Sequence, residues 1–165
     1  MPHRILVGVD DSDASRHALE RAIELAVEGN GRIGLLASAP NPPLVIATSP
    51  IVPPASRSQL CMEMVEWAER CVEEATQLVP DDIPVTKLVA HGDPCTALRD
   101  EVDRGCWDLV VVGQSARRFR ARRPVGARLG RRGVPVLVVD EPAAGPPPRE
   151  GREPRATAPV AAKGG

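Results

Sequence analysis

Aromatic side chains and long hydrophobic runs are both scarce in this chain of 165 residues. Only Trp67, Trp107 and Phe119 are aromatic, about 2% of the chain, and there is no Tyr. Proteins that bind single strands of nucleic acid usually stack bases on several rings, so nucleic acid is not an expected partner. No apolar run of about 20 residues could span a membrane, and residues 1–8 lack the order of a signal peptide. We therefore expect a cytoplasmic protein with no membrane contact.

The cysteines do not have the spacing of a metal or redox site. The four lie 10, 24 and 11 residues apart, at Cys61, Cys71, Cys95 and Cys106. Paired metal ligands and redox pairs are usually separated by two to four residues. We predict no metal site, and we expect all four thiols to be buried as small hydrophobic side chains.

What is present is enough for one globular domain. Hydrophobic residues make up 42% of the chain and charged residues 26%, which is typical of a packed core with a solvated surface. Twelve of the 18 prolines fall in residues 40–54 and 142–159. We predict a surface loop for the first of these segments. We predict that residues 1–140 form a single α/β domain and that residues 141–165 form a disordered tail.

The net charge of −1 hides an uneven distribution. Residues 1–112 hold 9 basic and 18 acidic side chains, whereas residues 113–139 hold eight Arg and no acid. Guanidinium groups in such a basic segment could bind phosphates. A solvated basic loop, or one paired with the acidic remainder of the molecule, is the alternative. Contact with a nucleic-acid backbone is less expected, because no helix-turn-helix, zinc module or aromatic platform accompanies the arginines.

Short apolar runs alternate with helical patterns along the chain. The pattern predicts five strands, at residues 4–9, 32–38, 85–90, 108–113 and 134–139. The run at 108–113 is apolar without alternation, as a parallel strand buried on both faces requires. Helices between the strands then predict a parallel sheet with helices on both faces. Because Pro135 cannot donate to a ladder, the last strand should lie at an edge or leave the N–H side of Pro135 free.

Three helices have recognisable ends or faces. The first begins near residues 10–13, a cluster of capping residues, and ends at residues 29–31, which contain two glycines. The third begins at Asp93 and Pro94 and ends at Gly105. Between them, apolar residues repeat at helical spacing before Pro80, at Leu60, Met64, Trp67, Cys71, Ala75 and Leu78. A shorter helix is predicted at residues 126–132.

Ligands of such sheets bind beyond the carboxyl ends of the strands, where the strand order reverses. Asp10, Ser38, Gly92 and Gly113 lie at or just after the carboxyl ends of four of the predicted strands. Asp10 either accepts hydrogen bonds from a ligand or supports the helix cap. Gly113 either lets a ligand approach the backbone or allows a turn.

Together these features resemble the universal stress protein A family over residues 4–139. The resemblance rests on ILVGVDDSDAS at the start, HGDP at 91–94, DLVVVG at 108–113 and VPVLVV at 134–139. It implies a flavodoxin-like or Rossmann-like three-layer sandwich with strand order 3-2-1-4-5. It also implies a homodimer in which residues 134–139 pair with their copy.

Nucleotide-binding members of that family carry G-x2-G-x9-G-[ST] after the fourth strand. Gly113 and Gly126 match the first and third glycines, whereas Ala116 and Ala127 stand where the second glycine and the hydroxyl residue would be. A Cβ at a left-handed position costs about 1–2 kcal/mol. The lost hydrogen bond costs about 1.5–3 kcal/mol.

The resemblance implies a pocket for an adenine nucleotide such as ATP, with Mg²⁺ only alongside the nucleotide. Its implied lining is Val9, Asp10, Ser38, Val112, Gly113, Ala116, Gly126 and Ala127, and the candidates for phosphate contact are Arg117, Arg118 and Arg120. No base is positioned beside the phosphate loop, so any hydrolysis of ATP should be slow.

The expected function is therefore a stress-response module that binds an adenine nucleotide weakly and signals through its dimer or its partners. The alternative is a dimeric interaction module that binds no nucleotide, which Ala116 and Ala127 favour. A small hydrolase is a more distant reading, because residues 113–116 match only half of the G-x-S-x-G nucleophile elbow.

Overall fold

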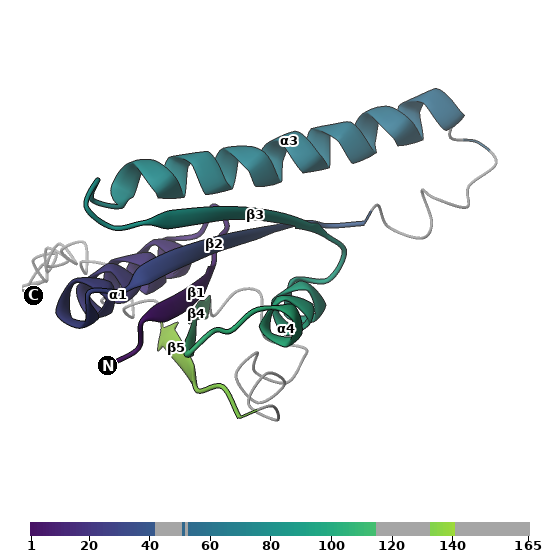
Figure 1. Ribbon diagram of the computed structural model, residues 1–165. Coiled ribbons are helices and arrows are strands. Elements are labelled where there is room, and N and C mark those ends of the chain that lie inside the picture. The colour runs from purple at the N-terminus through teal and green to yellow at the C-terminus, as the bar shows by residue number, and fades with distance from the viewer. Residues whose placement is uncertain (42–50, 52, 115–132, 141–165) are drawn as a thin grey trace, which may run out of the picture.

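The computed structural model describes residues 1–41, 51, 53–114 and 133–140. Its elements alternate between strand and helix, as expected (Figure 1). In chain order they are β1 (Arg4–Gly8), α1 (Asp13–Gly29), β2 (Arg32–Ala39), α3 (Pro54–Leu78), β3 (Val85–His91), α4 (Pro94–Arg104), β4 (Leu109–Gln114) and β5 (Val136–Asp140).

The five strands form one parallel sheet in the order β3-β2-β1-β4-β5. Arg4 of β1 pairs with Arg32 of β2, and Ile5 pairs with Leu109 of β4. This confirms the expected fold class and strand order. The order reverses between β1 and β4, so the carboxyl ends of these two strands define the switch point.

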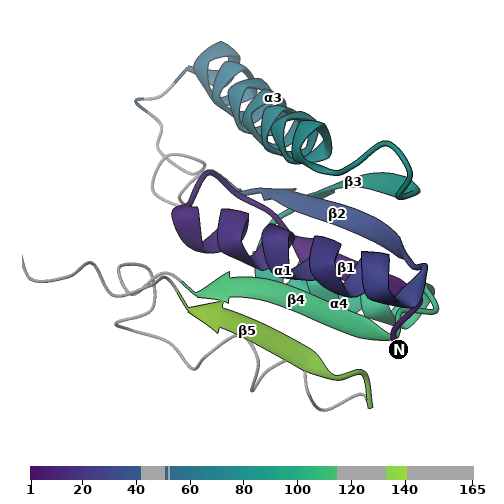
Figure 2. The ribbon, with the colours of Figure 1, turned by 90° about the vertical axis from the view of Figure 1, so that its left-hand side faces the viewer.

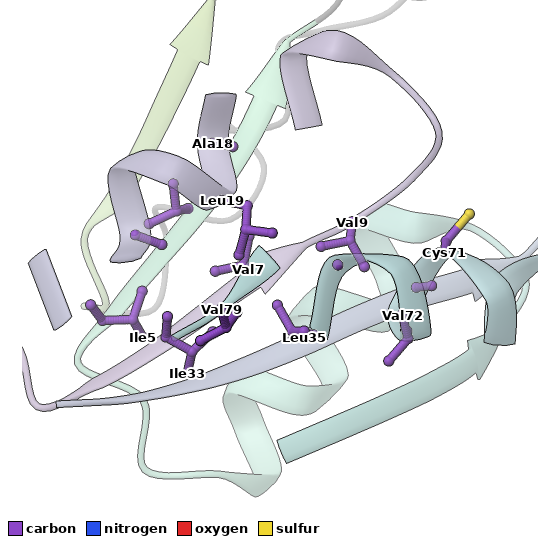
Figure 3. Packing of buried hydrophobic residues seen from close by; sticks show 14 of the residues in the cluster. Ile5, Val7, Val9, Ala18, Leu19, Ile33, Leu35, Cys71, Val72 and Val79 are labelled. Atoms are coloured by element: carbon purple, nitrogen blue, oxygen red, sulfur yellow. The ribbon is translucent and has the colours of Figure 1, made fainter. Parts of the chain in front are cut away.

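Helices cover both faces of the sheet (Figures 1 and 2). Helices α1 and α3 lie on one face, where they bury Ile5 and Val7 of β1 in the larger core cluster (Figure 3). On the other face, Leu98 of α4 packs with Leu6 of β1 in a smaller cluster. Successive β1 side chains thus point to opposite faces, which is why its sequence is continuously apolar.

The helix caps follow the local sequence. Ser12 is the N-cap of α1 and its Oγ accepts a hydrogen bond from the Ser15 backbone N–H, while Asn30 ends the helix in the left-handed conformation. Asp93 caps α4 in the same way, with its carboxylate accepting from the Thr96 N–H. Both helix starts were predicted because a cap is a property of three or four neighbouring residues.

Helix α3 differs from the prediction at both ends. It begins at Pro54, a residue predicted to lie in a loop, because proline is well tolerated in a first helical turn. Leu78 was predicted to face the core but is 53% exposed, whereas Val72 and Val79 are buried. The spacing gave the helical period and most of the core-facing residues correctly, because Cys71 and Ala75 are buried and Met64 and Trp67 pack against the core. Leu78, the last residue of the helix, is exposed, and Val79 just beyond it is buried in its place.

The cysteine prediction is half wrong. Cys71 is buried and Cys95 is partly buried, but Cys61 and Cys106 are exposed. Cys61 lies in the first half of α3, whose surrounding residues are mostly exposed, and Cys106 lies in the turn before β4. A cysteine is buried only where another helix or strand packs over its side chain.

Strand β5 is at the edge of the sheet, as predicted, but Pro135 lies just before the strand and its backbone faces β4 and not the open edge. Among the helices of the described residues, none has the length and apolar character that crossing a membrane requires. The predicted helix at 126–132, most of the loop predicted at 40–54 and the tail predicted at 141–165 lie outside the described residues.

Candidate functional site

The turn between β1 and α1 is built around Asp10. Its Oδ1 accepts hydrogen bonds from the backbone N–H and the hydroxyl of Ser12, and its own backbone N–H donates to Ser15 Oγ at 2.9 Å. Ser12 in turn caps α1. One carboxylate oxygen of Asp10 therefore organises this turn. The predicted supporting role of Asp10 is present, in addition to any role toward a ligand.

Gly113 lies against the first turn of α1. A Cβ on Gly113 would stand 2.6 Å from the Ser15 backbone N and still closer to the carbonyl group of Ala14. Real Cβ atoms do not approach backbone atoms so closely, so only glycine lets α1 reach β4 here. The close approach predicted at Gly113 is real, but what approaches is the helix.

Asp10 and Gly113 are linked through this helical turn. Ser15 accepts a hydrogen bond from the Asp10 N–H through its Oγ, and its own backbone N lies over Gly113. The carboxyl ends of β1 and β4 are thus held together by the same residue. This places two of the predicted site residues at the switch point of the sheet.

Val9, Ser38 and Val112 are also at this end of the sheet but are buried, with exposed fractions of 5–7%. Val9 belongs to the core on the α1 and α3 face, and Val112 belongs to the core on the α4 face. In this arrangement the two valine side chains fill the two cores. Val9 and Val112 could therefore contact a ligand only through their backbone groups.

Ser38 joins the ends of β2 and β3. Its hydroxyl donates to the Gly92 carbonyl oxygen at 2.8 Å, and the Gly92 N–H donates to the Ala39 carbonyl oxygen. Gly92 has φ +97°, a conformation that glycine adopts without strain. These hydroxyl and backbone groups hold the strand ends together. Of the side chains of Val9, Asp10, Ser38 and Val112, that of Asp10 is half-buried and the other three are buried.

Cys71 of α3 is a neighbour of this site that the sequence did not indicate. The pKa of the Cys71 thiol is raised to about 11, mainly by burial and in addition by the carboxylates of Asp11 and Asp10. Both effects disfavour the thiolate. The negative charges of Asp10 and Asp11 at the end of β1 therefore lie close enough to Cys71 of α3 to raise its pKa.

The other predicted site residues lie outside the described residues. These are Ala116, Gly126 and Ala127 and the candidates for phosphate contact Arg117, Arg118 and Arg120. Within residues 1–41, 51, 53–114 and 133–140, no group of three or more His, Cys, Asp or Glu side chains is arranged to hold a metal ion. The described part of the site offers carboxylate acceptors, and its serine hydroxyls build the turn or bridge the strands.

Comparison with known proteins places this site in a known fold. Residues 1–140 match the family model described as the universal stress protein family. A comparison with the curated proteins found no match.

Among solved structures, a universal stress family protein from Burkholderia pseudomallei is 24% identical, with a TM-score of 0.63, over 83% of this chain and 95% of that chain. A universal stress protein described as a complex with cAMP is 23% identical, with a TM-score of 0.57, over 84% and 97% of the two chains. A family protein from Arabidopsis thaliana, described with AMP bound, is 20% identical, with a TM-score of 0.51, over 90% and 98%.

Proposed function

The chain belongs to the universal stress protein family, and we propose that it is a stress-response module that binds an adenine nucleotide weakly at the carboxyl edge of its sheet. The observation that carries the proposal is the junction of Asp10 and Gly113 through the first turn of α1. It lies where the strand order reverses, which is the usual ligand position in open parallel sheets.

Two of the similar solved structures support the choice of ligand. One is described as a complex with cAMP and the other with AMP bound. The shared part of these ligands is adenosine with one phosphate. A half-buried carboxylate at Asp10 suits this part, because it can accept hydrogen bonds from the ribose hydroxyls or the amino group of adenine.

The phosphate end of the ligand would lie toward residues 115–127. Arg117, Arg118 and Arg120 supply positive charge there, and Mg²⁺ would accompany the nucleotide. Ala116 and Ala127 depart from the family motif at the positions that normally shape the phosphate loop. We therefore expect a Kd in the tens of micromolar or weaker, about −6 kcal/mol.

The second candidate is a dimeric interaction module that binds no nucleotide. Ala116 and Ala127 favour it, because both weaken the phosphate end of the motif. The two candidates predict different behaviour of the same variants.

Calorimetry with ATP separates them. The wild type should bind weakly, and Ala116→Gly with Ala127→Ser should bind at least tenfold more tightly. Asp10→Asn is the matched probe of the base and ribose end, because the Asn amide oxygen can still accept from Ser12 and keep the turn. Added to the double variant, Asp10→Asn should abolish the gain in affinity for ATP without lowering Tm. No heat of binding with either the wild type or the double variant would reject the nucleotide and leave the interaction module.

We also propose that β5 pairs with its copy in a homodimer. The strand is apolar and lies at the edge, where unpaired backbone groups would otherwise face solvent. The Pro135 carbonyl accepts from the Val110 N–H of β4, so the backbone of Pro135 is turned toward β4. By alternation along the strand, the N–H of Val138 faces the open edge.

This alternation gives a backbone test of the dimer. Val138 packs against the core on the α4 face, so a charge at this position would disturb folding as well as assembly. Val138→Pro removes the outward donor and one half-buried valine side chain but adds no charge and keeps the donors that face β4, so it should yield a folded monomer in light scattering. Leu137→Pro, which removes a donor facing β4, should instead lower Tm. A wild type that is monomeric at micromolar concentration would reject the dimer.

A further inference from the structure

A cavity lies at the opposite end of the sheet from the proposed nucleotide site. Its volume is about 200 Å³, and its lining comes from the amino ends of the strands and the turn before β4. The lining residues are Arg4, Arg32, Thr86, Gly105, Cys106 and Trp107. In Figure 2 this edge is the side marked N, and the arrowheads of β4 and β5 point away from it.

Two arginines stand side by side in this cavity. Arg4 and Arg32 are directly paired in the β1–β2 register, so their side chains leave the sheet on the same face. Like charges on paired positions destabilise a sheet. Among the described residues, neither guanidinium group is part of an ion pair.

The nearby carboxylates are engaged with other groups. Asp108 Oδ2 accepts hydrogen bonds from the backbone N–H groups of His3 and Arg4, both at 3.0 Å. Glu101 Oε1 accepts from the indole N–H of Trp107 at 3.3 Å. These acids fix the backbone and the indole, and neither of the two forms an ion pair with Arg4 or Arg32.

Trp107 forms a rigid apolar wall beside the arginines. A Cβ on Gly34 would stand 2.8 Å from Cζ3 of the indole, and a Cβ on Gly105 would stand 2.7 Å from Cδ1. The ring therefore packs closely against both glycines, and a side chain at either position would displace it. The lining of the cavity combines two exposed arginines, the polar residue Thr86 and one apolar surface.

We propose that this cavity binds a small phosphate monoester. The two guanidinium groups match the double negative charge of the phosphate and can bind its oxygens in a bidentate manner. Thr86 donates a further hydrogen bond, and Trp107 lies against the organic group. A volume of about 200 Å³ is below the usual range for drug-sized ligands, which favours an organic group of about one ring. The site is independent of the nucleotide site.

The test uses Trp107 as a local reporter. The chain has two tryptophans, so Trp67→Phe leaves Trp107 as the only one. Phenyl phosphate should change its fluorescence saturably at fixed ionic strength, inorganic phosphate should do so at least fivefold more weakly, and benzyl alcohol should have no saturable effect. Arg4→Gln with Arg32→Gln should raise the half-saturating concentration at least tenfold.

A charge-matched control separates local binding from general attraction. Arg21→Gln with Arg99→Gln removes two exposed arginines from α1 and α4 and should leave the half-saturation unchanged. Should the first pair fail to fold, Arg4→Lys with Arg32→Lys keeps the charge, loses the bidentate geometry and should still weaken binding. Asp10→Asn should have no effect, so a failure here is distinct from a failure of the nucleotide proposal.

The exposed thiols give a second readout. Phenyl phosphate should slow alkylation of Cys106 by iodoacetamide, and should not slow alkylation of Cys61, which is exposed on α3. Unchanged binding in the Arg4 and Arg32 variants, or equal protection of both thiols, would overturn the proposal.

Discussion

The two ends of the sheet differ in charge but resemble each other in construction. At the carboxyl end, Asp10 and Asp11 surround the turn into α1, and Gly113 admits the backbone of that helix. At the amino end, Arg4 and Arg32 stand in register, and Gly34 admits the ring of Trp107. Each end thus places charged side chains beside a glycine that is required by packing.

This comparison changes how a glycine at a candidate site is interpreted. Gly113 follows a central strand at the switch point and matches a nucleotide motif, yet its missing Cβ is fully explained by α1. Gly34 is in mid-strand, away from the switch point, and its missing Cβ is explained by Trp107. At both ends, the evidence for a ligand must come from the charged side chains.

The largest expected effect is at the carboxyl end. Gly113→Ala should lower the free energy of unfolding by about 3 kcal/mol, because the new methyl group meets backbone atoms that no rotamer change can move. Gly8→Ala is the control, since its Cβ would meet the flexible Leu98 side chain at 3.3 Å. Urea denaturation measures both. Equal costs for the two variants would show that α1 does not rest on Gly113.

The amino end should give a smaller effect of the same kind. Gly34→Ala should cost about 2 kcal/mol, because it displaces a side chain and not a backbone. In a Trp107→Leu background the same substitution should cost less than half as much. If the two costs simply add in thermal or urea unfolding, Gly34 and Trp107 are not in contact.

The thiol of Cys71 tests the field at the carboxyl end. Its pKa of about 11, against an ordinary 9.0, should hold its thiolate fraction at pH 8 about a hundredfold below that of an ordinary thiol. Asp11→Asn should lower the pKa, since it removes a neighbouring negative charge. Mass spectrometry after alkylation across a pH series measures the midpoint, with exposed Cys61 as internal control. Identical midpoints for Cys71 and Cys61 would contradict the burial of Cys71 and its proximity to Asp10 and Asp11.

The same pKa has a consequence for stability. The neutral thiol is favoured in the folded state, so its contribution is complete below about pH 9 and is lost as the pH rises through about 11. Cys71→Ala should therefore lose less stability than the wild type over this interval. A parallel loss in both proteins would assign the effect to other groups.

What could be predicted from the sequence was local or topological. The caps at Ser12 and Asp93 and the parallel sheet follow from neighbouring residues and from the alternation of elements. The exposure of Leu78 and Cys106 and the contact of Gly113 with α1 depend on how elements pack. The influence of Asp11 on Cys71 joins residues far apart in the chain, and no spacing rule reports such a pair.

The most direct test of the central claim is hydrogen exchange with and without saturating ATP. We predict slower exchange at residues 9–15 and 111–127, the two segments of the sequence that contain Asp10 and Gly113, and unchanged exchange at residues 3–5 and 104–108 of the amino end. Protection confined to the amino end, or no protection at concentrations well above the tens of micromolar, would contradict nucleotide binding at the carboxyl edge.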